Sequence, residues 1–118
     1  MGKRSRQRRR DDLPGAPTTE YAGPDDMVLE LRGALSPATR RRYADTLAAG
    51  LDREDARARA IELLFEHLAV SWTISDVRTD RQKELLGRYR MATAAEREFV
   101  LRSVRAHLTE NFPDMEAP

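Results

Sequence analysis

The hydrophobic positions of this chain follow two periods, and the first is the two-residue period of a strand. Met27, Leu29 and Leu31 fall on one face, with charged residues such as Glu30 on the other, as in a half-buried β-strand. The Gly-Pro-Asp-Asp sequence just before them is typical of a turn. We therefore predict a short β-hairpin across residues 18–32. A short helix capped by one of the two aspartates is the alternative for the same residues.

After Gly33 the spacing becomes helical, and four helices are predicted. The first begins at Ser36, a favourable N-cap, with Pro37 in the first helical position, where its missing N–H is not needed. Gly50 is a natural end for this helix. The second is capped by Asp52 and carries apolar residues at helical spacing as far as the only tryptophan: Ile61, Leu64, Phe65, Leu68 and Trp72.

The last two helices are predicted from capping boxes, in which a threonine precedes a glutamine or glutamate by three residues. The third helix is expected to begin at Thr79-x-x-Gln82 and contains Gly87, which we interpret as permitting a close helix contact. The fourth begins at Thr93-x-x-Glu96 and ends before Pro113, because proline disfavours helix in the residue before it. Residues 70–74 are β-prone, so the second helix is expected to fray near its end.

These elements predict a mainly α fold, with a short N-terminal β-hairpin followed by a compact four-helix bundle. Residues 1–17 are expected to form a disordered basic tail and linker, because they lack periodic apolar residues and contain Pro14, Gly15 and Pro17. Residues 18–112 are expected to form one hairpin-plus-helical domain, followed by a C-terminal tail over residues 113–118.

Charge divides the chain into two unlike parts. Six of the eight residues from Lys3 to Arg10 are basic: Lys3, Arg4, Arg6, Arg8, Arg9 and Arg10. The chain has 21 basic and 20 acidic residues. Outside this segment it therefore has 15 basic and 20 acidic residues, a net negative charge. A run of like charge usually stays solvated and acts as an interaction tail. Contact with a nucleic-acid backbone and simple solubilisation are the two interpretations of this tail.

Candidate chemistry is sparse in the sequence. The chain has no cysteine, and its two histidines, His67 and His107, lie inside predicted amphipathic helices. It contains no glycine-rich phosphate loop, no nucleophile elbow and no pair of histidines with metal-ligand spacing. We therefore expect a protein that is not an enzyme, with no catalytic residues, cofactor or metal. No apolar run approaches the length of a membrane span, so a cytoplasmic protein without membrane partners is expected.

The β-prone segment around the tryptophan is the candidate protein interface. Trp72 is either a core residue that closes the bundle or an interface anchor, since tryptophan is enriched at binding hot spots. Val70, Ile74 and Val77 would extend an apolar patch around it if it were an anchor.

The order of elements over residues 18–74 resembles that of tail assembly chaperones of tailed phages and prophages. The resemblance rests on Thr18–Tyr21 and Leu29–Arg32, on Leu35–Thr39, and on the helix from Ile61 to Trp72. It implies a non-enzymatic protein-interaction module whose partner is a helical tape-measure-like protein. The alternative function, drawn from the basic tail, is a nucleic-acid-associated accessory protein.

Overall fold

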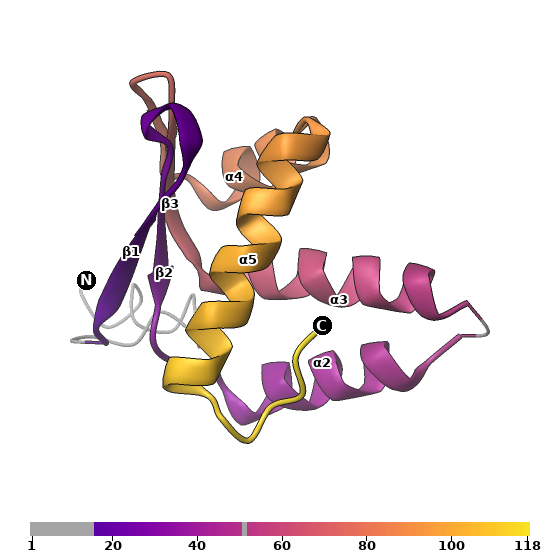
Figure 1. Cartoon of the computed structure of the whole chain (residues 1–118). Helices are drawn as coiled ribbons and strands as arrows, with labels where there is room; N and C mark the ends of the chain where they lie inside the picture. The colour runs from indigo at the N-terminus through magenta and orange to yellow at the C-terminus, as the bar shows by residue number, and fades with distance from the viewer. Residues whose placement is uncertain (1–15, 51) are drawn as a thin grey trace.

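The chain folds into two layers, a four-stranded antiparallel sheet and a layer of helices (Figure 1). A computed structural model describes residues 16–50 and 52–118. The basic tail and most of its linker lie outside the described residues. The predicted hairpin followed by a four-helix bundle is wrong as a fold class, because the strands form a sheet on which helices pack.

The sheet consists of two hairpins that pair through their inner strands. Strands β1 (Thr18–Ala22) and β2 (Val28–Arg32) form the predicted N-terminal hairpin. Strands β3 (Ala69–Ile74) and β4 (Val77–Thr79) form a second hairpin, and β2 pairs with β3 to give the order β1-β2-β3-β4. The short η1 helix (Pro24–Asp26) connects the first two strands.

The second hairpin is the main departure from the sequence prediction, which continued the second helix to Trp72. Helix α3 (Arg53–Leu68) instead ends at Leu68, and the chain enters β3 at once, without a glycine or proline between them. The β3–β4 turn is formed by Ser75 and Asp76, at φ of 51° and 65°. This left-handed geometry is usual for a two-residue hairpin turn but is normally signalled by glycine or asparagine, which are absent here.

Most predicted helix starts are confirmed. Helix α2 (Pro37–Ala48) is capped by the Ser36 side chain, and α3 by the Asp52 side chain. Helix α5 (Ala94–Asn111) begins with the complete capping box of Thr93 and Glu96. Helix α4 (Gln82–Arg90) has no side-chain cap, and Thr79 lies at the end of β4, so the capping box predicted there is wrong. Gly87 also lacks its expected close contact, since a Cβ there would meet nothing within 4 Å.

The core lies between the sheet and the helices. Helix α5 packs on β2, while α3 and α4 pack on β3, and the inward-facing Leu29, Leu31 and Trp72 are almost fully buried. Helices α2 and α3 form an antiparallel pair whose connecting end points away from the sheet (Figure 1). Among the described residues, no helix is both long enough and apolar enough to cross a membrane.

The last residues of the chain fold back onto the helices. The Tyr43 hydroxyl donates to the backbone oxygen of Glu116 at 2.6 Å, and the Arg105 guanidinium donates to that of Pro118 at 3.0 Å. Pro118 is buried, and Met115 packs against the core. Residues 113–118, which were expected to form a tail, therefore pack against α2 and α5.

Candidate functional site

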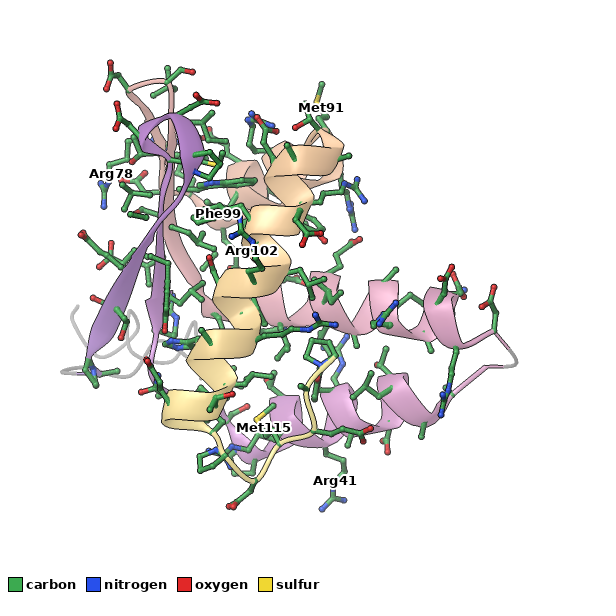
Figure 2. All side chains as sticks on the ribbon, in the orientation of Figure 1. Arg41, Arg78, Met91, Phe99, Arg102 and Met115 are labelled. Atoms are coloured by element: carbon green, nitrogen blue, oxygen red, sulfur yellow. The ribbon has the colours of Figure 1, made fainter. Side chains whose placement is uncertain are left out.

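One face of the sheet carries no helix from the part of the chain that the structure describes. We call it the outer face and define it by the side chains that lie on the same side of the strands as Glu30: Thr18, Glu20, Ala22, Val28, Glu30, Arg32, Ser71, Thr73 and Arg78. Arg32 lies opposite Thr18 and is buried. In Figure 1 all the helices lie on the opposite side of the strands. Arg78 points away from the helices in Figure 2. A sheet of this kind packs on its core through one face and leaves the other free for water or a partner.

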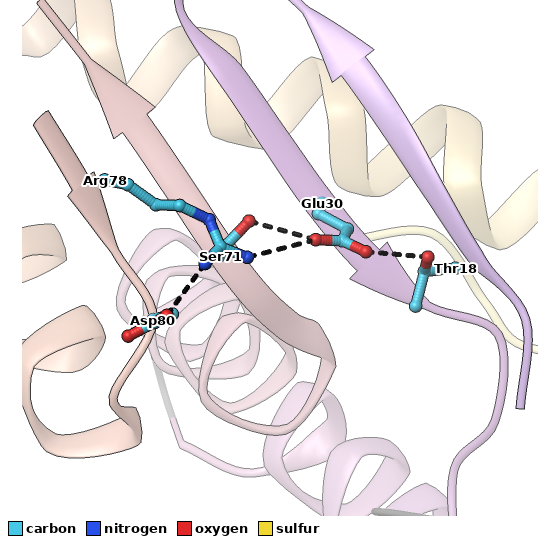
Figure 3. Close-up of polar contacts among 5 residues, drawn as sticks. All are labelled: Thr18, Glu30, Ser71, Arg78 and Asp80. Carbon is cyan, nitrogen blue, oxygen red and sulfur yellow. Dashed lines mark hydrogen bonds and ion pairs between the residues drawn. The ribbon is translucent and has the colours of Figure 1, made fainter. Parts of the chain in front are cut away.

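Glu30 is the centre of a hydrogen-bonded cluster on the outer face (Figure 3). The Thr18 hydroxyl donates to Glu30 Oε2 at 2.7 Å, and the Ser71 hydroxyl donates to Oε1 at 3.0 Å. An Arg78 nitrogen lies 3.9 Å from Oε1, and the same guanidinium donates to Asp80 at 2.8 Å. All four strands therefore contribute to the surroundings of Glu30, whose side chain is only 20% exposed.

A second carboxylate lies directly opposite this cluster. Glu20 on β1 pairs in register with Glu30 on β2, and Glu30 pairs in turn with Ser71. Glu20 is exposed, and its side chain makes no hydrogen bond or ion pair with the part of the chain that the structure describes. Like charges at directly opposed cross-strand positions are destabilising. A cation placed between the two carboxylates would relieve this repulsion.

The neighbouring row of the outer face is apolar to weakly polar. Ala22, Val28 and Thr73 pair across the first three strands, and Arg78 completes the row on β4. The outer face thus places the Glu20 and Glu30 carboxylates between a row that ends in Arg78 and the cross-strand pair of Thr18 and Arg32.

The structure places Trp72 in the core. Its side chain is 1% exposed and makes an edge-to-face contact with Phe65, with ring centroids 5.5 Å apart. The Arg88 guanidinium lies 5.5 Å from the indole centroid and donates to Glu96 at 2.9 Å. This hydrogen bond lowers the pKa of the Glu96 carboxyl. Of the two roles considered for Trp72, core residue and interface anchor, its position in the structure is that of a core residue.

The other residues of the expected apolar patch are not gathered around an exposed tryptophan. Val70 and Ile74 are half-buried, and Ile74 packs against the core. Val77 is 66% exposed near the tip of the β3–β4 hairpin. An interface role for Val77 stays a prediction, whereas Trp72 is closed to a partner in this conformation.

A buried histidine connects α5 to the first two strands. His107 is fully buried, and its Nε2 lies 2.8 Å from the backbone oxygen of Arg32. Nδ1 lies 2.9 Å from the Tyr21 hydroxyl and 3.1 Å from the Asn111 amide nitrogen. A neutral imidazole that donates from Nε2 and accepts at Nδ1 satisfies all three contacts. Burial lowers the pKa of His107, despite the opposing effects of the Arg32 carbonyl and nearby Glu110.

This histidine should make stability depend on pH. Because the folded-state pKa is below the ordinary value of about 6.5, the unfolded chain binds the proton first as pH falls. The contribution is complete above about pH 7 and decreases as pH falls through about 6.5 toward the folded pKa. Urea denaturation at a series of pH values should therefore show a smaller slope between pH 7 and 5 in His107→Gln than in wild type. An unchanged slope in His107→Gln would contradict the assignment.

The three consecutive arginines of α2 do not act as one surface. The Arg40 guanidinium lies 5.1 Å from the Phe112 ring centroid, and Arg42 lines a groove of about 340 Å³ between α2 and α3. Arg41 points away from the body (Figure 2). The tail residues Lys3, Arg4, Arg6, Arg8, Arg9 and Arg10 lie outside the described residues, so their expected contact with nucleic acid stays a prediction.

Sequence reasoning missed the outer face, although its polar positions were visible. Glu30 was assigned to the exposed side of a strand, but Ser71 and Arg78 were not expected to lie beside it. Residues 16–50 and 52–118 contain no group of three or more side chains that could together hold a metal ion. No protein-family model, curated protein or solved structure matches the chain.

Proposed function

We propose that this chain is a non-enzymatic protein-interaction module that binds a basic helical segment of another protein on the outer face of its sheet. The observation that carries the proposal is the opposed pair Glu20 and Glu30, on a face that no helix of residues 16–50 and 52–118 covers. Glu30 is already oriented by Thr18 and Ser71, so this carboxylate is held in place before a partner arrives. Preorganisation of this kind reduces the entropy lost on binding.

A helix is a suitable occupant for geometric and chemical reasons. Sheets commonly bury a face under helices, and the outer face is the one that lacks such a layer among the described residues. A helix that crosses the strands could present lysine or arginine to the two carboxylates and small apolar residues to Ala22 and Val28. The chaperone resemblance supports a partner of this shape, because it implies a helical tape-measure-like protein. We accordingly propose a chaperone-like role in phage or prophage tail assembly.

The proposed site can be tested with a designed peptide. The probe is an amphipathic helical peptide of lysine, alanine and leucine, titrated into the isotope-labelled full chain and followed by NMR. We expect amide shifts on the outer-face strands. We also expect Glu20→Lys to weaken binding by up to about fivefold, since each exposed ion pair contributes about 0.2–1 kcal/mol. Glu98→Lys on α5 is the matched control and should bind the peptide like wild type. Shifts confined to the helices would contradict the proposal.

The specific chaperone role has a separate genomic test. We expect the gene to lie just before a very long gene that encodes a helical tape-measure protein. A gene located instead beside an integrase or replication gene would contradict this role and favour the alternative function.

The alternative, a nucleic-acid-associated accessory protein, is favoured by the basic run from Lys3 to Arg10. Neutralising phosphates with several basic residues gives binding that weakens steeply with salt. A salt titration of DNA binding should therefore distinguish wild type from a variant in which these six basic residues are replaced by glutamine. Equal affinity of the two proteins would eliminate this alternative.

A further inference from the structure

We propose that the groove between α2, α3 and α5 is a second binding surface, which takes an extended acidic segment of another protein. In this structure residues 113–118 occupy the groove, and we call them the strap. The contacts of the strap show what chemistry the groove accepts, so the strap indicates the kind of partner and also competes with it. The groove lies on the helical side of the molecule, away from the outer face (Figure 1).

The groove holds the main chain of the strap. The Tyr43 hydroxyl donates to the backbone oxygen of Glu116 at 2.6 Å. Both Nε and Nη2 of Arg105 donate to the backbone oxygen of Pro118, at 3.2 and 3.0 Å. Tyr43 stays a donor at neutral pH, because burial and the Glu116 carboxylate raise its pKa despite the opposing effect of Arg105. Every extended chain carries backbone oxygens, so the same donors can serve another segment.

Few buried groups hold the strap in place. Four of its six residues are exposed, Met115 is half-buried against the core, and Pro118 is buried. The carboxylates of Asp114 and Glu116 form no hydrogen bond or ion pair with residues 16–50 and 52–118. Segments with few buried contacts open at a small part of the free energy of global unfolding. The strap can therefore leave the groove while the rest of the domain stays folded.

The strap fills only part of the groove. Two cavities of about 370 and 430 Å³ lie beside it, and Leu47, Arg53 and Glu116 line both of them. The second cavity follows α2 along Ala44 and Ala48 toward the connection between α2 and α3. Leu47 is only half-buried, so the wall of this space has an apolar surface that the strap leaves uncovered. A partner segment with larger side chains would bury more of the groove than the strap does.

Charge favours an acidic occupant. The charged side chains of the helices that line the two cavities or donate to the strap are three arginines and one glutamate: Arg53, Arg57, Arg105 and Glu54. Arg53 and Arg57 lie about one turn apart on α3, and neither forms an ion pair with the described part of the chain. The strap contributes Asp114 and Glu116 and no basic residue. An acidic partner segment therefore matches the excess of positive charge on the helices.

The test uses the full chain and a synthetic peptide with the sequence of the strap, Pro-Asp-Met-Glu-Ala-Pro, blocked at both ends. The peptide is titrated into isotope-labelled protein and followed by NMR. Met115→Ser removes the apolar anchor of the strap and leaves the groove intact. The peptide should bind this variant about four- to tenfold more tightly than wild type, since losing half the burial of a methionine raises the open fraction by about this factor. We expect the amide shifts on α2 and α5, around Tyr43 and Arg105.

Matched variants separate recognition of the main chain from general attraction of charge. In the Met115→Ser protein, Arg105→Gln should weaken peptide binding by up to about fivefold, because it removes the donors to the backbone oxygen. Arg41→Gln removes the same charge from a side chain of α2 that points away from the body (Figure 2), and it should leave the affinity unchanged.

Four results would overturn the proposal. They are no binding to either protein, equal affinity for wild type and Met115→Ser, equal weakening by Arg105→Gln and Arg41→Gln, and shifts confined to the outer face. Light scattering tests the other occupant: a wild-type dimer that Met115→Ser dissociates would assign the groove to the strap of a second copy and overturn the assignment to another protein. The outer face is tested separately by the lysine-rich helical peptide, so failure of either proposal leaves the other standing.

Discussion

Trp72→Ala should destabilise the protein by about 3–5 kcal/mol, the range for complete truncation of a large buried aromatic side chain. The residue is 1% exposed, packs edge-to-face on Phe65 and supports the Arg88 guanidinium. Domains of this size have a total stability of about 5–15 kcal/mol, so this single change removes a large part of it. Urea denaturation followed by circular dichroism measures the effect, since the variant lacks the only tryptophan that fluorescence could report.

Trp72→Phe provides the matched comparison. It keeps an aromatic ring against Phe65 and removes the indole N–H, which has no hydrogen-bond acceptor among the described residues. The smaller ring leaves a cavity, but removing an unsatisfied buried donor offsets part of the loss, so we expect a cost of about 1–2 kcal/mol. Equal stabilities of Trp72→Ala and wild type would show that the indole is not packed as described.

Gly23→Ala should have the second largest effect, about 1–3 kcal/mol of destabilisation from overpacking. A Cβ at this position would lie 2.5 Å from Phe99 Cδ1 and 2.6 Å from Cε1, closer than non-bonded carbons approach. Phe99 is 3% exposed and points from α5 toward the sheet (Figure 2), so the ring cannot move aside without disturbing the core. Thermal unfolding of the purified variant measures the loss.

Gly87→Ala is the control because it should change stability in the opposite direction. Gly87 is exposed inside α4, and a Cβ there meets nothing within 4 Å. Alanine should therefore stabilise the protein by about 0.5–1 kcal/mol through its higher helix propensity. Combining Gly23→Ala with Phe99→Leu should cost less than the sum of the two single changes, because both act on one contact. Additive costs would show that Phe99 is not the obstacle.

The starts of three helices could be predicted because their signals are local. Ser36, Asp52 and Thr93 each accept a hydrogen bond from a backbone N–H two or three residues later, so the few residues around each cap contain the whole interaction. The first hairpin was predictable for a similar reason, since its alternation and turn lie within residues 18–32. Thr79 shows the limit of such a signal: the same capping pattern occurs there, but pairing with Trp72 keeps Thr79 in a strand.

The second hairpin could not be predicted because its support is non-local. Residues 69–74 pair with β2, about 40 positions earlier in the chain, and this partner cannot be identified from the apolar run itself. Helical spacing continued through Trp72, so the period alone favoured a longer helix. Tertiary pairing overrode it, as is common for β-prone segments whose stability depends on neighbouring strands.

The sequence by itself determined the division between a basic segment and an acidic remainder, the first hairpin, and the caps of α2, α3 and α5. These features depend on charge and on contacts between residues close together in the chain. Only the tertiary structure decided that Trp72 is buried, that the described helices all pack on the same face of the sheet, and that Glu20 and Glu30 oppose each other beside Ser71. The physical reason is that burial and cross-strand neighbours are properties of pairing between distant segments, which no local pattern specifies.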